Sequence, residues 1–391
     1  MKLALVIHRY GDSVAGGSEA HGRGLARELA KSHEVEVLTT CAREYLSWRN
    51  EFEPGPSTVD GIRVTRYPVR KTRDLKRFAA VSDHVFNEPH TPEDEERWIL
   101  ENGPFVPDLT DAIRSRDDID FFLCYSFRYF TGVKGALAAG SRAILVPTAE
   151  EDAAVRLGVF ADLFRSVRGF LYLTPEEKEL IENAAGSLAA PSRVIGSGLN
   201  VQRSGPAPRE SLGVPARYLL YAGRIDRNKG VDILFRYFLW LAEEWSECPP
   251  LLLVGHPVLD IPDHPKVRHL GFVSEEVKSS LIEGAEIVLM PSRYESLSMI
   301  VLEAWALGRP VLANAACAVL QGQCRRSNGG LYYRDYAEFR LMLRKLMDDS
   351  ALGTALGTQG EAYVTSNYSW ARAAAETNEL LLELKGKGAR A

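Results

Sequence analysis

Short apolar runs alternate with longer amphipathic segments along most of the chain. An apolar run of a few residues is typical of a strand buried on both faces, whereas the longer segments have the periodicity of helices. The alternation therefore indicates parallel sheets covered by helices. In the first half it predicts strands at Leu3–Ile7, Glu34–Thr39, Gly61–Tyr67, Phe121–Tyr125, Ala143–Pro147 and Phe170–Leu173, and helices at Ser18–Lys31 and Glu176–Asn183.

The same alternation starts again in the second half. Glycines and prolines interrupt the pattern first, and they predict a linker at Ser192–Asn200. A helix is expected at Val231–Trp245, after the loop Gly223–Gly230, and an amphipathic helix at Trp370–Leu384 ends the pattern. Strands are expected at Tyr218–Ala222, Pro250–Gly255, Val267–Gly271, Glu286–Met290, Pro310–Ala313 and Gly330–Tyr333.

The length of 391 residues is too great for one ordinary hydrophobic core, so we expect two domains, at 1–192 and 193–367. Because each half repeats the same alternation, the predicted fold class is α/β, with two Rossmann-like doubly wound domains facing each other across a cleft.

Composition and charge narrow the functional classes. A net charge of −5 and a pI near 6.0 disfavour a nucleic-acid binder. The five cysteines form no C-x-x-C pair, which favours reduced thiols in the cytoplasm over a zinc site or a disulfide framework. No apolar run approaches the ~20 residues of a membrane-spanning helix, so any membrane contact is expected to be peripheral.

The stretch from Tyr294 to Glu303 carries the strongest chemical information. It follows an apolar strand and contains two carboxylates, with Glu295 expected in the loop and Glu303 in the second turn of the next helix. A helix N-terminus at the carboxyl end of a sheet binds phosphate, and carboxylates accept hydrogen bonds from hydroxyls. The pattern suits a sugar attached to a diphosphate, although one acid near a helix N-terminus can also be a simple dipole partner.

Two glycine-containing loops could contact the same kind of ligand. Gly223–Gly230 carries Arg224 and Lys229, and two cations in a tight loop suit a pyrophosphate. Gly16 and Gly17 precede the first helix and would allow close approach of a ligand to the backbone. The alternatives are a solvated turn for the first loop and an ordinary capped turn for the second. Neither half has the complete dinucleotide fingerprint, which disfavours a dehydrogenase.

Together these motifs resemble the retaining nucleotide-sugar glycosyltransferases of family 4, which have the GT-B fold and belong to the glycosyl transferases group 1. The resemblance is carried by Gly16 to Glu19, by Gly223–Gly230, and by the segment from Glu295 to Val311. It spans nearly the whole chain and is strongest from Tyr218 to Tyr333.

The resemblance implies a role for each motif residue. Arg224 and Lys229 would bind the donor diphosphate, Glu303 the ribose, and Glu295 the hydroxyls of the transferred sugar. The amides of Leu297 and Ser298 would contact the diphosphate or sugar, and Gly17 would lie beside the donor phosphates. The final helix, at about 368–391, would pack back on the first domain. Relatives of this fold need no metal for transfer, so neither a metal nor another cofactor is expected.

One position departs from the family. Many relatives have a histidine after the strand at Ala143–Pro147, and here Glu150 stands near that place. An acid there could bind a sugar hydroxyl or assist a proton transfer, and it could equally be a surface acid. The change puts the catalytic details in question. We include Glu150 with Glu295, Arg224 and Lys229 among the candidate catalytic residues.

Other features favour structural explanations. His8 and His21 are more simply read as structural, and Trp48, Trp98 and Tyr129 as core aromatics. A basic tract could face an anionic acceptor or a membrane surface, although a solvated surface is the simpler reading. The tract comprises Arg63, Arg66, Arg70, Lys71, Arg73, Lys76 and Arg77.

The expected activity is retaining transfer of a hexose from a UDP- or GDP-sugar to a hydroxyl of a glycan or lipid-linked glycan. Surface or exopolysaccharide assembly is the expected role, in the cytoplasm or on the inner face of the cell membrane. A nucleotide-sugar epimerase and a nucleotide-sugar-binding protein that has lost catalysis remain alternatives. The sequence leaves the donor base, the sugar, the acceptor and the oligomeric state open.

Overall fold

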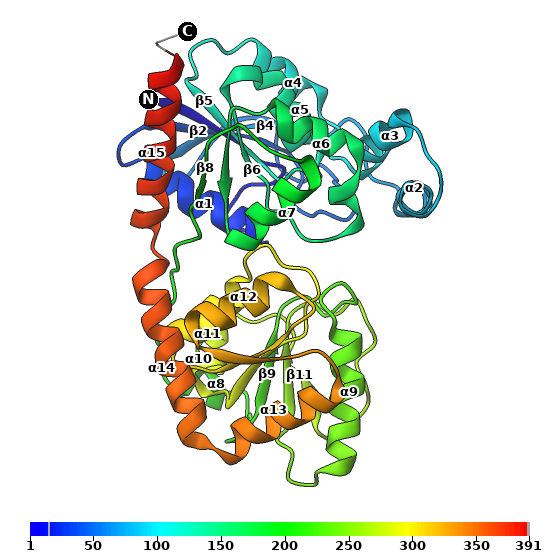
Figure 1. Cartoon of the computed structure of the whole chain (residues 1–391), viewed down its shortest axis with the longest axis vertical. Coiled ribbons are helices and arrows are strands. Elements are labelled where there is room, and N and C mark those ends of the chain that lie inside the picture. Colours follow the sequence, from blue (N-terminus) through cyan, green and yellow to red (C-terminus); the bar gives the residue numbers. More distant parts are fainter. Residues whose placement is uncertain (15, 389–391) are drawn as a thin grey trace. The chain divides into compact units, whose positions relative to one another are not determined.

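The computed structural model describes residues 1–14 and 16–388 and divides into two compact units. The first unit contains residues 1–198 and the C-terminal helix from Trp370 onward, and the second contains Leu199–Ser369. Each unit is a sheet of wholly or mainly parallel strands flanked by helices, which confirms the predicted α/β class (Figure 1). The chain leaves the first unit at Gly198, within the segment expected to be a linker.

The sheet of the first unit has eight strands among the described residues, in the order β3-β4-β2-β1-β5-β6-β7-β8. The strands are β1 Lys2–Val6, β2 Glu34–Thr40, β3 Gly55–Val59, β4 Ile62–Tyr67, β5 Phe121–Tyr125, β6 Ala143–Val146, β7 Gly169–Tyr172 and β8 Ser192–Val194. All pairs are parallel except β3 with β4. Strand β8 pairs with β7, so the linker predicted from Ser192 began too early.

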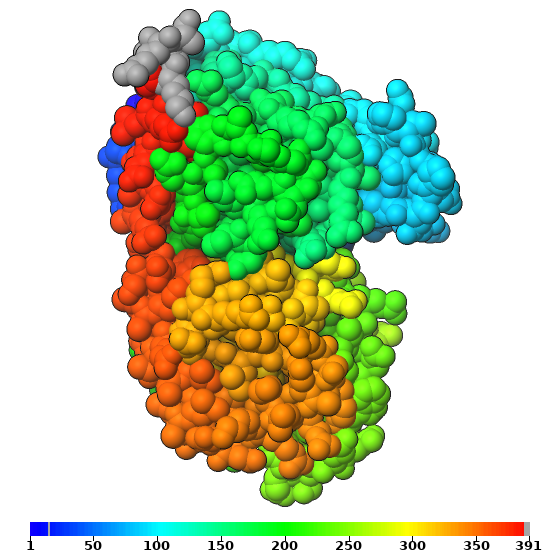
Figure 2. Space-filling view, in the orientation of Figure 1, coloured from blue at the N-terminus to red at the C-terminus, as the bar shows by residue number. Residues whose placement is uncertain are grey.

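The helices of the first unit are α1 Gly17–Leu29, α2 Leu75–Asn87, α3 Pro92–Asn102, α4 Pro107–Arg114, α5 Phe130–Ala139, α6 Gly158–Ser166, α7 Pro175–Ala185 and α15 Trp370–Gly388. Helix α7 begins as the sequence predicts, with Pro175 in its first turn and Thr174 accepting a hydrogen bond from the Glu177 amide. Helices α2 and α3 form a hairpin that protrudes from the body of this unit (Figure 2). Trp98 contacts Phe78 and Phe86 there, as expected for a core aromatic.

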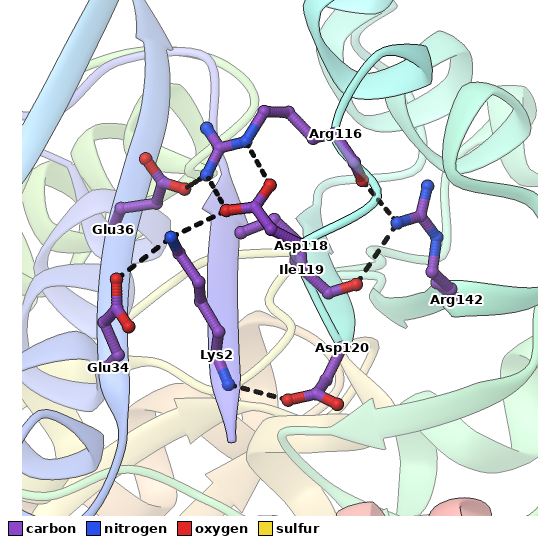
Figure 3. Close-up of polar contacts among 8 residues, drawn as sticks. All are labelled: Lys2, Glu34, Glu36, Arg116, Asp118, Ile119, Asp120 and Arg142. Atoms are coloured by element: carbon purple, nitrogen blue, oxygen red, sulfur yellow. Dashed lines mark hydrogen bonds and ion pairs between the residues drawn. The ribbon is translucent and has the colours of Figure 1, made fainter.

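Ionic contacts join the amino ends of the central strands (Figure 3). The Lys2 ammonium lies 3.0 Å from a carboxylate oxygen of Glu34 and 2.6 Å from one of Asp118. Arg116 bonds both Asp118 and Glu36, so the β1–β2 pair and the segment before β5 share one network. These charges lie at the sheet edge opposite to the carboxyl ends of the strands, where ligands bind in open α/β sheets.

The C-terminal helix α15 packs against α1 and β8 of the first unit. Its first residue, Trp370, occupies space that only glycines leave open: a Cβ on Gly24 or Gly198 would lie 2.0 or 2.2 Å from the indole ring. His21 also contacts Trp370, and the centroids of the two rings are 5.7 Å apart.

The sheet of the second unit has six parallel strands among the described residues, in the order β11-β10-β9-β12-β13-β14. They are β9 Leu219–Ala222, β10 Leu251–Val254, β11 Val267–His269, β12 Ile287–Met290, β13 Val311–Asn314 and β14 Gly330–Tyr333. Strands β9, β10 and β12 are buried along their full length, which explains their uninterrupted apolar sequence. The helices are α8 Ala207–Glu210, α9 Val231–Glu244, α10 Glu275–Gly284, α11 Met299–Ala306, α12 Ala318–Ser327, α13 Tyr336–Asp348 and α14 Ser350–Asn367.

Candidate functional site

The predicted donor-binding residues of the second unit follow the carboxyl ends of two adjacent strands. Arg224 and Lys229 follow β9, and Glu295 follows the neighbouring strand β12. From β9 the chain continues to β10 on one side, whereas β12 lies on the other side of β9. The topological switch point of the sheet is therefore between β9 and β12. Ligands of open α/β sheets bind at such points.

The loop Gly223–Gly230 is fixed in part by close approach of its backbone to that of the loop after β12. Gly230 has a φ of 67°, and a Cβ there would lie 2.2 Å from the carbonyl oxygen of Pro291. The Arg224 guanidinium bonds the Asp226 carboxylate, whose Oδ1 also accepts the Lys229 amide hydrogen at 2.8 Å. Asp226 therefore orients both cation-bearing positions of the loop, a role that the sequence analysis did not assign.

Lys229 connects this loop to the loop after β12. Its Nζ lies 2.9 Å from Oε1 of Glu295 and 3.3 Å from the carbonyl oxygen of Tyr294. The Glu295 side chain is only 12% exposed, so the pair is shielded from water on most sides. The structure thus brings together a cation and a carboxylate that are 66 residues apart in the sequence.

Helix α11 begins next to Glu295. Its N-cap, Ser298, has a φ of 67° and provides no side-chain cap, which leaves the first amides of the helix without that partner. The Ser298 hydroxyl is buried and has no hydrogen-bond partner among the described residues. Gln323 donates to the carbonyl oxygen of Leu297 at 2.7 Å and so fixes the turn that carries both predicted amides.

Glu303 lies in the second turn of α11, as predicted, and its carboxylate is 12% exposed. Lys278 of α10 approaches it, with Nζ 3.0 Å from Oε2 and 3.1 Å from Oε1. Burial raises the pKa of the Glu303 carboxyl, and the Lys278 charge offsets part of that shift. Lys278 was not a candidate in the sequence analysis, because nothing along the chain links it to a residue 25 positions away.

In the first unit, Gly16 precedes α1, whereas Gly17 is the first residue of the helix, one position earlier than the predicted start at Ser18. Gly16 is the N-cap, and a Cβ there would lie 2.1 Å from a carboxylate oxygen of Glu19. Among the described residues beyond its chain neighbours, no heavy atom lies within 4 Å of a Cβ added at Gly17. Their participation in donor binding stays a prediction.

Glu19 and His8 form a buried pair beneath that turn. His8 Nε2 lies 2.8 Å from Oε1 of Glu19, which also bonds the Arg9 guanidinium. Burial opposes the charge on Glu19, but its cationic and hydrogen-bonding neighbours outweigh burial and lower its pKa to about 2. Burial lowers the pKa of His8, so the neutral ring donates from Nε2, and its buried Nδ1 has no partner among the described residues.

Aromatic rings surround His8 at the carboxyl ends of the strands. The ring centroids of His8 and Tyr129 are 4.3 Å apart, and Trp48 contacts both rings from a fully buried position. Nearby, Arg128 bonds Asp152, and Nη1 of the same guanidinium lies 4.0 Å from Oε2 of Glu150. His8 and Tyr129 therefore lie near the carboxyl ends of the strands in this sheet, and their structural interpretation stays a prediction.

A buried carboxyl supports the loop that carries Glu150. Glu177 of α7 accepts the Ala149 amide hydrogen at 2.6 Å, beside Thr148 with its φ of 46°. Burial raises the pKa of Glu177 to about 8.

His21 is structural, as expected. Its ring bonds the Tyr125 hydroxyl at 3.1 Å and the Gly196 carbonyl oxygen at 2.9 Å, and burial lowers its pKa to about 4. The five cysteines are free and buried.

The basic tract is largely engaged within the first unit. Lys71 and Arg77 pair with Glu101, and Arg70 pairs with Asp108. Arg66 is buried, and Arg73 bonds carbonyl oxygens of the neighbouring loops. These contacts favour the solvated-surface reading over a membrane-facing one.

Among the described residues, no cluster of three or more histidine, cysteine, aspartate or glutamate side chains is placed to hold a metal ion. Within the same residues, every helix is too short or too polar to cross a membrane.

Comparison with known proteins finds a family similarity within the second unit. Residues 216–349 match the family described as glycosyl transferases group 1, and this range contains the cations and both carboxylates described above. The chain is also 28% identical to D-inositol 3-phosphate glycosyltransferase 1 of Catenulispora acidiphila, over 93% of this chain and 90% of that protein.

Solved structures share the fold of the whole chain. Sucrose-phosphate synthase from Thermosynechococcus elongatus has a TM-score of 0.72 at 19% identity and covers 99% of both chains. Anabaena HepE in complex with UDP has a TM-score of 0.69 at 14% identity and covers 98% of this chain and 99% of its own. These neighbours are GT-B glycosyltransferases, which confirms the predicted fold class.

Proposed function

Because the chain is a glycosyltransferase, we propose that it moves a hexose from a UDP-sugar to an acceptor hydroxyl with retention of the anomeric configuration. The observation that carries the proposal is the contact between Lys229 and Glu295, which joins the loops after two adjacent strands, β9 and β12. Arg224 and Glu303 follow the same two strands, and all four residues lie within the matched domain. Two cations suit a diphosphate, and two shielded carboxylates suit the hydroxyls of a ribose and a hexose.

Arg224 and Lys229 stabilise the negative charge that grows on the leaving diphosphate. Preorganised charges of this kind contribute roughly 10²–10³ in kcat when one donor is removed. Asp226 and Glu295 hold the two cations before the donor arrives, which limits reorganisation during the reaction. The two cations also neutralise diphosphate charge where other enzymes use a metal ion, so we propose transfer without a metal.

The amides of Leu297 and Ser298 contact the diphosphate or sugar in this proposal. Attack from the same face as the departing diphosphate, assisted by a phosphate oxygen, gives retention without a protein nucleophile. We therefore assign Glu295 to binding hexose hydroxyls rather than to forming a covalent intermediate.

The donor base is proposed from relatives. The sequence leaves UDP and GDP open, and the Anabaena HepE structure contains UDP. A structural neighbour from E. coli with a TM-score of 0.71 is bound with UDP-2-fluoro glucose. UDP-sugars are accordingly the first donors to test.

The acceptor is proposed to be an uncharged hydroxyl group of a glycan or lipid-linked glycan, in surface or exopolysaccharide assembly at the cytoplasmic face of the membrane. The carboxyl edge of the first unit supports an uncharged group, because Asp152 and Glu150 compensate the Arg128 charge. The two carboxylates would repel the negative charge of a phosphate monoester and so oppose its attraction to the arginine.

The test is transfer from a panel of UDP- and GDP-sugars to neutral glycans, lipid-linked glycans and inositol phosphate. Arg224→Ala should lower kcat by about 10²–10³ with the best donor. Arg227→Ala is the matched control, since this exposed cation lies in the same loop and should leave kcat unchanged.

Each contrary result has a distinct meaning. An unchanged kcat in Arg224→Ala would refute the role of that cation. Conversion of the donor sugar without any acceptor would show an epimerase instead, and donor binding without transfer to any acceptor would show a binding protein that has lost catalysis.

A further inference from the structure

Lys278 bridges two carboxylates on the surface of the second unit. Its Nζ lies 3.0 and 3.1 Å from the two carboxylate oxygens of Glu303 and 2.7 Å from Oε2 of Glu275. Glu275 is 83% exposed, whereas Lys278 and Glu303 are 21% and 12% exposed. The contact with Glu303 is thus shielded, and the contact with Glu275 is screened by water.

Two opposing effects act on the ionisation of the Glu303 carboxyl. Burial disfavours the ionised carboxyl and raises its pKa, and the Lys278 ammonium is the only neighbouring cation described that opposes this effect. Burial also disfavours the ammonium, yet the charges of Glu303 and Glu275 outweigh it and raise the pKa of Lys278. The neighbouring carboxylates therefore favour the charged form of Lys278, and its charge in turn favours the ionised form of the Glu303 carboxyl.

One oxygen of the Glu303 carboxylate keeps acceptor capacity that no described donor uses. Oε2 of Glu303 is buried and has no donor in hydrogen-bonding geometry among the described residues, although Lys278 lies within ionic distance of it. An ionised carboxylate has about four acceptor positions, so it can accept two hydroxyl hydrogens while it remains paired with an ammonium. A protonated carboxyl would lose part of that acceptor capacity.

We propose that Lys278 is a positioning residue for donor binding, which orients Glu303 and holds it in the ionised form that accepts the ribose hydroxyls. The inference rests on the proposed function, because it assumes that Glu303 binds the ribose. Lys278 acts through Glu303 and does not contact the reacting bond.

Charged groups on other elements do not replace Lys278. Helix α11 packs against α10, α14, β12 and β13. Among the described residues, the ionic contacts of Glu303 come from Lys278, and Glu275 of the same helix α10 adds a repulsive charge. Removal of the ammonium should therefore leave the buried carboxyl without a counter-charge and raise its pKa further.

The test compares the donor KM and kcat of Lys278→Met, Lys278→Gln and Lys278→Arg with those of the intact enzyme between pH 5.5 and about 9, together with UDP binding by calorimetry. Melting temperatures identify any variant that is not folded. In Lys278→Met and Lys278→Gln, KM should become pH-dependent and rise by up to about tenfold for each pH unit below the new pKa of Glu303, with little change in kcat. Ribose binding is common to the ground and transition states, so KM carries the effect.

Three controls separate a positioning role from a merely structural one. Lys278→Arg keeps the charge and should restore a flat KM profile. Glu275→Gln removes the exposed partner and should resemble the intact enzyme. Glu303→Gln removes the charge permanently and should raise KM at every pH.

The outcomes distinguish the two claims. A flat, unchanged KM profile in folded Lys278→Met or Lys278→Gln, with loss of donor binding in Glu303→Gln, would overturn the role of Lys278 and leave the proposed function intact. A lower kcat with unchanged KM would also overturn it, because Lys278 would then act in the chemical step. An unaffected Glu303→Gln enzyme would refute the ribose assignment and the inference together.

Discussion

Gly230→Ala should disrupt the donor loop, because two separate obstacles oppose a side chain there. The backbone has a φ of 67°, and this left-handed conformation costs an L-residue roughly 1–2 kcal/mol. The new Cβ would lie 2.2 Å from the Pro291 carbonyl oxygen, compared with at least 3.4 Å for an ordinary contact. Since the neighbour is backbone, one of the two loops must move, and overpacking of this kind costs about 1–3 kcal/mol more.

Gly213→Ala separates the two obstacles. Gly213 lies in the same unit and has a φ of 59°, but no heavy atom lies within 4 Å of an added Cβ. It should show the backbone cost alone. One kcal/mol shifts Tm by roughly 2–4 °C in a domain of this size, so Gly230→Ala should melt about 2–12 °C below Gly213→Ala.

The assay is thermal unfolding of both variants, followed by calorimetric titration with UDP at a temperature where both are folded. Movement of the loop after β9 should shift Lys229 away from Glu295, so UDP binding should weaken in Gly230→Ala and remain unchanged in Gly213→Ala. Equal melting temperatures for the two variants would refute the contact argument. A lower melting temperature of Gly230→Ala with unchanged UDP binding would refute the link between this contact and the donor site.

Two buried carboxyls should affect stability with opposite pH dependence. Glu19 has its pKa lowered from 4.5 to about 2, so its stabilisation is present above pH 4.5 and is lost as the pH falls toward 2. Glu19→Gln should therefore flatten the acid side of a plot of Tm against pH, and a parallel acid side would contradict the ionised state of Glu19. Glu177 has its pKa raised from 4.5 to about 8, so the folded state should lose stability as the pH rises from 4.5 to about 8. Glu177→Gln should have a flatter Tm profile in that interval, and an unchanged slope would show that Glu177 is not the group responsible.

The alternation of apolar runs and amphipathic segments located most of the central strands to within one or two residues. It succeeded because strands such as β9, β10 and β12 are buried on both faces and cannot contain polar residues. It missed β3, whose residues are mostly exposed at the sheet edge, and the protruding hairpin of α2 and α3. Neither feature has the uninterrupted apolar sequence of a central strand.

The candidate site divides in the same way. The sequence alone indicated Arg224, Lys229, Glu295 and Glu303, because each stands at a fixed offset from a strand end, and parallel strands bring their carboxyl ends to one edge. Only the tertiary structure joined Lys278 to Glu303 and Lys229 to Glu295, and only it placed His8 beside Glu19 and Tyr129. Local pattern determines where a strand or helix ends, because burial and capping depend on residues that are close together in the sequence. The partner of a buried charge depends instead on which elements pack together, and residues far apart along the chain decide that.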